Sequence, residues 1–196
     1  MGSGDRRFAP RKSLVFGASV GRGSVRGMEE NPYSRHLEGR EAVAVLGASA
    51  GRLRELFGSF SAEEIDASPG PGRWSLRELM AHLADCEIAW GWRLRQALSK
   101  DMPMLDSFDQ DRWADRYQAY DFASAQVTFE VLRAWNLRLL TGVSEQDRLR
   151  SAEHPERGRV TLGTIVETMA GHDLHHIKLI EGLRKKEANV AVPSPS

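Results

Sequence analysis

The residues most capable of chemistry in this 196-residue chain are two histidines, His172 and His176, in the segment GHDLHHIKLI. Residues four apart lie on one face of a helix, and the apolar residues around the pair predict that this face is buried. Two buried imidazoles need partners, because an unpaired buried polar group costs about 1–3 kcal/mol. A divalent metal ion is one such partner. Hydrogen bonding within an ordinary core is the other interpretation, and the spacing alone does not decide between them.

A third histidine, His82, lies at the edge of the apolar stripe of an earlier helix. It sits near the middle of that helix, as His172 and His176 do in theirs, so the three imidazoles meet if the two helices face each other. Three neutral imidazoles with a fourth position open to water are typical of catalytic zinc. Metal sites in helical bundles are built from facing helices in this way. The candidate metal ligands are therefore His82, His172 and His176.

Four further residues near the histidines have two interpretations each. Cys86, four residues after His82, is either a fourth ligand or a small buried core residue, and we favour the core residue. Asp85 and Asp173 either orient the ligand imidazoles as hydrogen-bond acceptors or are charges on the helix surface. Asn136 either faces the site or is a hydrogen-bonded polar residue of the core.

The other histidines and two arginines carry weaker hypotheses. His175 falls on a mixed helix flank and is interpreted as peripheral, and His36 has no neighbours of interest. His154 precedes a proline in a loop, where we expect a local hydrogen bond. Arg93 and Arg133 are candidates for binding a substrate carboxylate, although solvation at the surface is the favoured interpretation. The tryptophans receive no chemical role and are expected mostly in the core or a pocket wall: Trp74, Trp90, Trp92, Trp113 and Trp135.

Helical periodicity dominates the sequence between its two ends. Apolar residues recur with a 3.6-residue period in four segments, at about 41–60, 76–99, 122–142 and 161–186. Ser75 with Glu78 fits a capping box at the start of the second segment, and Thr161 is a good N-cap for the fourth. A short helix is expected within 109–117. No strand pattern of useful length appears, so the predicted fold class is all-α, a four-helix bundle.

Composition excludes several classes of protein. The 27 basic and 27 acidic side chains balance, which gives no electrostatic argument for binding nucleic acid or an anionic membrane. No apolar run is long enough to span a bilayer. The single cysteine, Cys86, excludes an intramolecular disulfide and makes a reducing cytoplasm the expected compartment. The expected partner is a small-molecule substrate, and a homodimer is an open expectation.

The two ends of the chain differ from the middle. Residues 1–27 are rich in Gly, Ser and Arg, and are expected to be a disordered extension. We favour an upstream extension or a misassigned start, with folding beginning near Met28; a transit peptide and a leader left by cloning are the alternatives. Residues 28–187 form the expected bundle domain, and residues 188–196 an expected disordered tail.

Four segments in order resemble the DinB superfamily of DinB/YfiT-like metalloenzymes. They are RWSLRELMAHLADCEIAWGWRLRQAL, FDQDRWA, HPERG followed by a TL pair, and GHDLHHIKLI. The resemblance covers about Glu41 to Arg184. It implies a four-helix bundle with a long crossover connection. It also implies a metal triad of one histidine from the second helix and an HxxxH pair from the fourth, which here are His82, His172 and His176.

The resemblance also implies a class of reaction. Characterised relatives include transferases and isomerases that use low-molecular-weight thiols, such as bacillithiol, mycothiol or glutathione, with a divalent metal that activates the thiol. The leading hypothesis is therefore a cytoplasmic enzyme whose divalent ion (zinc, nickel or iron) serves the transfer of a low-molecular-weight thiol cosubstrate. The alternatives are a metal-dependent hydrolase and a non-catalytic metal- or ligand-binding bundle.

Overall fold

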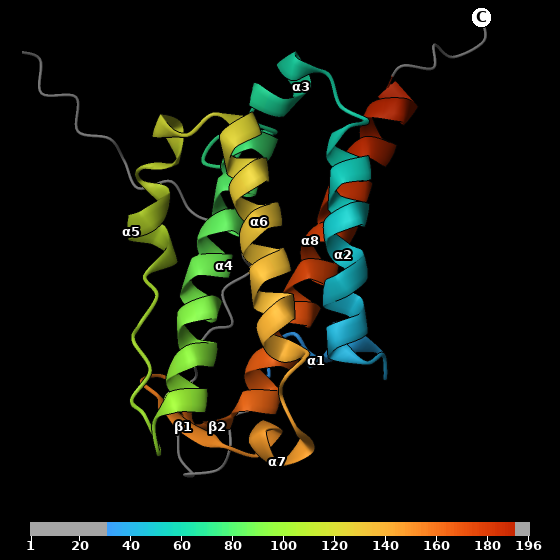
Figure 1. Ribbon diagram of the computed structural model, residues 1–196. Helices are drawn as coiled ribbons and strands as arrows, with labels where there is room; N and C mark the ends of the chain where they lie inside the picture. Colours follow the sequence, from blue (N-terminus) through green and yellow to red (C-terminus); the bar gives the residue numbers. More distant parts are fainter. Residues whose placement is uncertain (1–30, 191–196) are drawn as a thin grey trace, which may run out of the picture.

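Four long helices form the molecule that the computed structural model describes, which comprises residues 31–190. They are α2 (Ala42–Phe57), α4 (Leu76–Ser99), α6 (Phe122–Leu140) and α8 (Leu162–Val190). In space, α2 packs along α8 and α4 packs along α6 (Figure 1). The all-α four-helix bundle expected from the apolar periodicity is confirmed.

The bundle has an uncommon order of helix directions. Helices α2 and α8 run one way, while α4 and α6 both run the other way (Figure 1). The reason is the connection of residues 100–121, which returns along the full length of the bundle before α6 begins. This connection contains the short helix α5 (Gln110–Ala114) and the 3-10 helix η1 (Tyr117–Ala119). The long crossover that the family resemblance implies is therefore present.

Side-chain caps fix where the long helices begin. The Ser75 hydroxyl accepts from the Glu78 backbone N–H at 3.2 Å, and the Glu78 carboxylate accepts from the Ser75 N–H at 2.9 Å. This is the predicted capping box of α4. The Thr161 hydroxyl accepts from the backbone N–H of Thr164 at 3.1 Å, as expected for the N-cap of α8. These bonds satisfy backbone donors that have no partner within the helix.

A layer of buried polar residues divides the apolar core into two clusters. Along α8, residues up to Ala170 belong to one cluster and Ile180 belongs to the other. Buried polar side chains from all four long helices lie between the two clusters. We call this set the polar layer; its members are Ser49, His82, Glu87, Arg133, Asn136, His172, Asp173 and His176.

The expected core stripe of α6 is partly wrong. The periodicity predicted a stripe through Phe122, Ala125, Phe129, Leu132, Leu139 and Val143. The structure buries Ala125 and Phe129 but continues through Arg133, Asn136 and Leu140. Polar residues occupy buried positions here because other helices supply their partners, and a pattern of apolar residues cannot register such positions.

The periodicity of the sequence did not predict several short helices and strands. Helices α1 (Ser34–Leu37), α3 (Ala62–Asp66) and α7 (Glu145–Arg148) were not expected, and neither was the antiparallel hairpin of β1 (Ser151–His154) and β2 (Gly158–Thr161). The expectation of no strands was therefore wrong, because strands of four residues are too short to show alternation. His154 ends β1 instead of lying in a loop. Its register partner Gly158 has φ 67°, a left-handed conformation that glycine adopts without a steric cost.

Two remaining expectations concern the tryptophans and the chain ends. Trp74 and Trp90 are buried, but Trp92, Trp113 and Trp135 are exposed, so the expectation that most tryptophans lie inside was wrong. The expected extension 1–27 lies outside the described residues. Helix α8 continues through residues 188–190 of the expected tail. Among residues 31–190, none of the helices combines the length and apolar character that crossing a membrane requires.

A glycine in α8 lets the start of the described chain lie close against the bundle. A Cβ atom at Gly171 would come within 2.5 Å of the Tyr33 carbonyl oxygen, whereas a Cβ at Gly182 would meet nothing within 4 Å. We expect Gly171→Ala to lower the free energy of unfolding by about 1–3 kcal/mol, because Tyr33 must move. The control Gly182→Ala should raise it by up to about 1 kcal/mol through helix propensity. Urea unfolding measures both, and equal effects would contradict the packing.

Candidate metal centre

Three imidazoles from two helices meet in the polar layer. His172 Nε2 lies 3.1 Å from His82 Nε2 and 3.0 Å from His176 Nε2. All three side chains are buried. One shared proton cannot serve both contacts, because a ring nitrogen carries either a single hydrogen or a single lone pair. Imidazole ligands of a tetrahedral zinc ion, each about 2.0–2.1 Å from the metal, lie about 3.3–3.4 Å apart. The two distances from His172 Nε2 are close to this value, so the imidazole donors suit a divalent ion.

Burial keeps these imidazoles uncharged. It lowers the pKa of His82 from 6.5 to about 3, and the positive form of His175 nearby acts in the same direction. Burial also holds the pKa values of His172 and His176 well below the usual value of 6.5. The second cause is the repulsion that a charged ring would meet from the neighbouring histidines. Neutral imidazoles offer lone pairs at neutral pH, which is the form that binds a metal.

Aromatic rings hold the imidazoles in place. The Trp90 ring meets His172 edge to face at 4.8 Å between centroids, and Tyr33 does the same at 5.3 Å. The Trp74 ring lies 5.0 Å from that of His82. These contacts restrict rotation of the imidazoles and keep the surroundings apolar.

Cys86 lies beside the imidazoles. Its Sγ is 3.6 Å from His82 Nε2, and the ligand atoms of His82, Cys86 and His172 all lie within 4.8 Å of one another. Burial raises the pKa of the Cys86 thiol well above its usual value, with the Glu87 and Asp85 carboxylates adding to the effect. The distances suit a fourth ligand, whereas the neutral thiol suits the small buried core residue that we favour.

The acidic neighbours do not orient the imidazoles as one interpretation expected. Within the described residues, His172 Nδ1 and His176 Nδ1 have no hydrogen-bond partner, so neither Asp85 nor Asp173 accepts from them. Burial raises the pKa of the half-buried Asp85 to about 6. Asp173 is fully buried, so the interpretation as a surface charge is also wrong for it.

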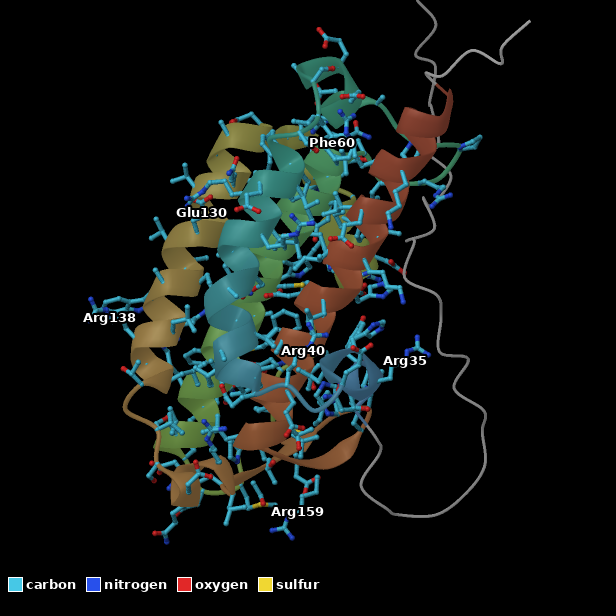
Figure 2. The ribbon with its side chains drawn as sticks, turned by 90° about the vertical axis from the view of Figure 1, so that its right-hand side faces the viewer. Arg35, Arg40, Phe60, Glu130, Arg138 and Arg159 are labelled. Carbon is cyan, nitrogen blue, oxygen red and sulfur yellow. The ribbon has the colours of Figure 1, made fainter. Side chains whose placement is uncertain are left out.

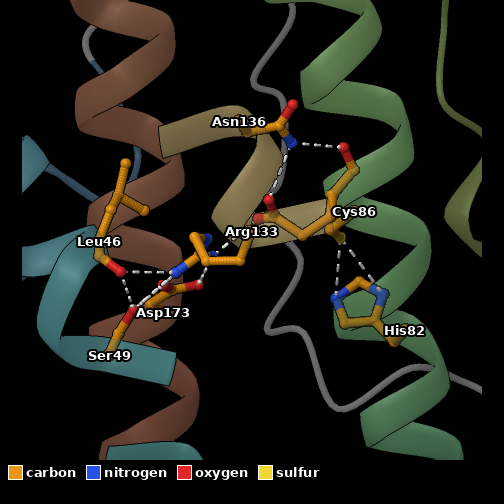
Figure 3. Close-up of polar contacts among 8 residues, drawn as sticks. Leu46, Ser49, His82, Cys86, Arg133, Asn136 and Asp173 are labelled. Carbon is orange, nitrogen blue, oxygen red and sulfur yellow. Dashed lines mark hydrogen bonds and ion pairs between the residues drawn. The ribbon is translucent and has the colours of Figure 1, made fainter. Parts of the chain in front are cut away.

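Asp173 pairs instead with Arg133, which contacts all three other long helices (Figure 3). From α6, the buried Arg133 guanidinium forms ion pairs with Glu87 on α4 at 2.7 Å and with Asp173 on α8 at 2.6 Å. It also donates to the Ser49 hydroxyl at 2.7 Å and the Leu46 carbonyl at 3.1 Å, both on α2. Arg133 is therefore neither a solvated surface residue nor a ligand for a substrate carboxylate, and both expectations are corrected.

The charges of the network around Arg133 are paired, although among the described residues its buried Nε has no hydrogen-bond partner. Burial by itself would lower the pKa of Arg133, but Asp173 and Glu87 together raise it above its ordinary value. Asn136 donates from Nδ2 to the Glu87 carboxylate at 3.0 Å, which makes it a hydrogen-bonded core residue, one of its two expected interpretations. Asp173 directly follows His172 in the sequence, and Glu87 directly follows Cys86. The network therefore fixes the helix segments that carry the candidate ligands.

The other histidines lie around this centre. His175 is half-buried on the flank of α8, as expected, with its ring 5.1 Å from that of His176. His36 was expected to have no neighbours of interest, but it lies in α1 with its ring 5.2 Å from that of His175. His154 Nδ1 accepts a local hydrogen bond from the Glu156 backbone N–H at 3.3 Å, as expected.

A cavity of about 150 Å³ opens beside His172. His172, Cys86 and the aromatic rings of Tyr33 and Trp90 line it, together with Arg93. Arg93 is thus half-buried in a cavity wall, and the favoured expectation of simple surface solvation is corrected. The volume is below the roughly 300–1,000 Å³ of most ligand pockets, so it suits a small molecule or one end of a larger one.

Comparisons with known proteins identify the family of this chain. The model of the DinB superfamily matches residues 46–180, and the chain belongs to this family. One protein from Oceanobacillus iheyensis is 30% identical over 128 residues, covering 64% of this chain and 73% of its own length. A second from the same organism is 28% identical over 133 residues, covering 66% and 76%. Both carry provisional names as metal-dependent hydrolases.

A solved structure shares the fold. YfiT from Bacillus subtilis, described as having an unusual four-helix bundle topology, superposes with a TM-score of 0.70 at 19% identity. The match covers 85% of this chain and 93% of YfiT. In this chain, α4 and α6 run in the same direction and are joined by the crossover of residues 100–121 (Figure 1).

The buried ion pairs predict a large effect of removing their shared cation. We expect Arg133→Met to lower the free energy of unfolding by about 3–5 kcal/mol, because two buried carboxylates lose their partner. Arg138, on the same helix, is exposed and points away from the bundle (Figure 2). The control Arg138→Met should change the free energy by less than about 0.5 kcal/mol. Urea unfolding compares the two, and similar losses in both would contradict the role of the network.

The lowered pKa values predict a pH dependence of the metal-free protein. Between pH 6.5 and about 3, His82 binds a proton in the unfolded chain but stays neutral in the folded protein. The free energy of unfolding should therefore be unaffected by these imidazoles above pH 7. It should fall below pH 6.5 by up to about 1.4 kcal/mol per pH unit for each of the three. Urea unfolding with chelator at several pH values measures the slope. His176→Gln should make the slope shallower, and an unchanged slope would contradict the burial of a neutral ring.

Proposed function

We propose that the protein is a metal-dependent enzyme that hydrolyses a small molecule, with a divalent ion held by His82, His172 and His176. The observation that carries the proposal is the contact of His172 Nε2 with both other Nε2 atoms, at 3.1 and 3.0 Å, in a fully buried setting. The provisional names of the relatives from Oceanobacillus iheyensis support hydrolysis as the reaction.

The protein's own residues contribute position and environment. When bound, a divalent ion acts as a Lewis acid and lowers the pKa of a water molecule toward neutrality. The three neutral rings offer it lone pairs, and zinc, nickel and iron all accept such ligands. His172 lines the cavity, so a substrate reaches the centre from that side. The rings of Trp90 and Tyr33 exclude bulk water there and so strengthen electrostatic interactions with the substrate.

Transfer of a low-molecular-weight thiol is the second candidate function. The family resemblance favours it, and it requires the same three ligands, with a thiol in place of water. A non-catalytic bundle, in which the ion only ties α4 to α8, is the third. A cytoplasmic location and a homodimer stay predictions alongside these candidates.

Metal content tests the ligand set. We expect His172→Ala to lose the stoichiometric metal of the purified protein, measured by elemental analysis, because the central imidazole of the three is removed. His175→Ala is the matched control, since His175 is the adjacent histidine on the same helix but lies on its flank. Cys86→Ala should also keep its metal if the three imidazoles are the ligands. Metal retained by His172→Ala, or lost equally from His175→Ala, would contradict the proposal.

Activity separates the candidate functions. Hydrolysis of members of an ester and amide panel, lost on chelation and restored by metal, would support the hydrolase. Turnover only when bacillithiol, mycothiol or glutathione is added would favour thiol transfer instead. Bound metal without turnover in either panel, combined with strong destabilisation by chelator, would favour the non-catalytic bundle.

A further inference from the structure

The cavity beside His172 carries two guanidinium groups that form no ion pair with the described part of the chain. Arg93, from α4, and Arg157, from the turn between β1 and β2, both line it. Arg93 donates from Nη2 to the backbone carbonyl of Asp106 at 2.8 Å, which fixes the side chain without neutralising it. Throughout residues 31–190, neither arginine lies within ion-pair distance of an acidic side chain. Both are partly buried, so solvent screens their charges less than at an open surface.

The two positive charges act on each other. Burial lowers the pKa of Arg93, and the positive charge of Arg157 lowers it further. Two like charges at the wall of one cavity raise the free energy of the fold unless an anion lies between them. Two nearby acids, Glu156 and Asp106, attract the Arg93 charge, but among residues 31–190 neither lies within ion-pair distance of it. Glu156 lines the cavity but is exposed, and the Asp106 carboxylate accepts a hydrogen bond from Trp92 Nε1 at 3.0 Å.

A third donor faces the same cavity. His154 lines it and is buried. Its Nδ1 accepts from the backbone of Glu156, so the neutral ring carries its proton on Nε2, where it is available to an acceptor. Burial, followed by the charges of Arg93 and Arg157, lowers the pKa of His154 to about 4, so the ring stays neutral at neutral pH. A protonated ring would have added a third charge.

The hairpin holds Arg157 in this place. The Glu153 carbonyl accepts from the Leu105 N–H at 2.8 Å, and the Glu153 N–H donates to the Pro103 carbonyl at 2.9 Å. These bonds tie β1 to the crossover connection, which follows α4. The hairpin that the sequence pattern missed therefore brings Arg157 to the cavity that Arg93 lines.

We propose that Arg93 and Arg157 bind the anionic group, a carboxylate or a phosphate, of a small substrate. Guanidinium groups bind both anions through paired, charge-assisted hydrogen bonds. The volume of about 150 Å³ admits such a group on a short chain. The reaction at the other end of the molecule, near His172, rests on the proposed function, but binding of the anion itself requires no metal.

Titration calorimetry with inorganic phosphate and, separately, with succinate tests the site in the full chain, both as purified and after chelation. We expect at least one of the two to bind, and Arg93→Gln and Arg157→Gln each to weaken that binding about tenfold or more. The control is Arg159→Gln, because Arg159 is exposed, is not among the residues that line the cavity, and lies at the lower edge of the view in Figure 2. It should bind as the unchanged chain does.

The outcomes separate the two anions and the two proposals. Binding of phosphate alone assigns a phosphate, and binding of succinate alone assigns a carboxylate. No binding of either, or equal weakening by Arg159→Gln, overturns the anion site. His172→Ala should keep anion binding while losing metal, and Arg93→Gln should keep metal while losing anion binding. A failure of the metal centre is thereby distinguished from a failure of the anion site.

Discussion

The ion pairs of Arg133 with Glu87 and Asp173 are the constraint on which the interior of this bundle depends. A guanidinium does not lose its proton in a protein, so its burial requires compensating charges at short range. Here α4 and α8 each supply one carboxylate, and α2 supplies a hydroxyl and a carbonyl. These contacts therefore fix how the four long helices are rotated and shifted along their axes relative to one another at the height of Arg133. Asp173 directly follows His172 in sequence and Glu87 lies on α4 with His82, so the same constraint positions the helix segments that carry the candidate metal ligands.

The network also gives the polar layer its electrostatic character. One guanidinium and two carboxylates leave a net negative charge inside the bundle, next to three neutral imidazoles. A cation is favoured in such a place, since the low dielectric of the interior strengthens its attraction to the carboxylates. The charge is positive at the cavity, where neither Arg93 nor Arg157 forms an ion pair with an acidic side chain of residues 31–190. A centre that favours a cation inside and an anion at its entrance suits the proposed metal-dependent enzyme with an anionic substrate.

The sequence predicted those features that depend on residues close together in it. The four long helices and the capping box at Ser75 follow from helical periodicity and local spacing. Periodicity placed His82, His172 and His176 on apolar stripes, but their meeting was expected only if α4 and α8 face each other, as the family resemblance implied. The burial of Arg133 and Asp173 was missed, since periodicity places charged residues at the surface unless a partner on another helix is known. Arg157 and Tyr33 were missed for a related reason. Their positions depend on a four-residue strand and a four-residue helix, whose packing is set by distant segments.

The position of the ion itself is the most direct measurement. In a crystal of the metal-loaded protein, anomalous scattering at the absorption edge of the metal locates the ion independently of the refined model. We expect a single peak about 2.0–2.2 Å from the Nε2 atoms of His82, His172 and His176. A peak bound by Nδ1 atoms, or by Cys86 with His176 uncoordinated, would contradict the three-imidazole centre, as would the absence of a peak in the polar layer.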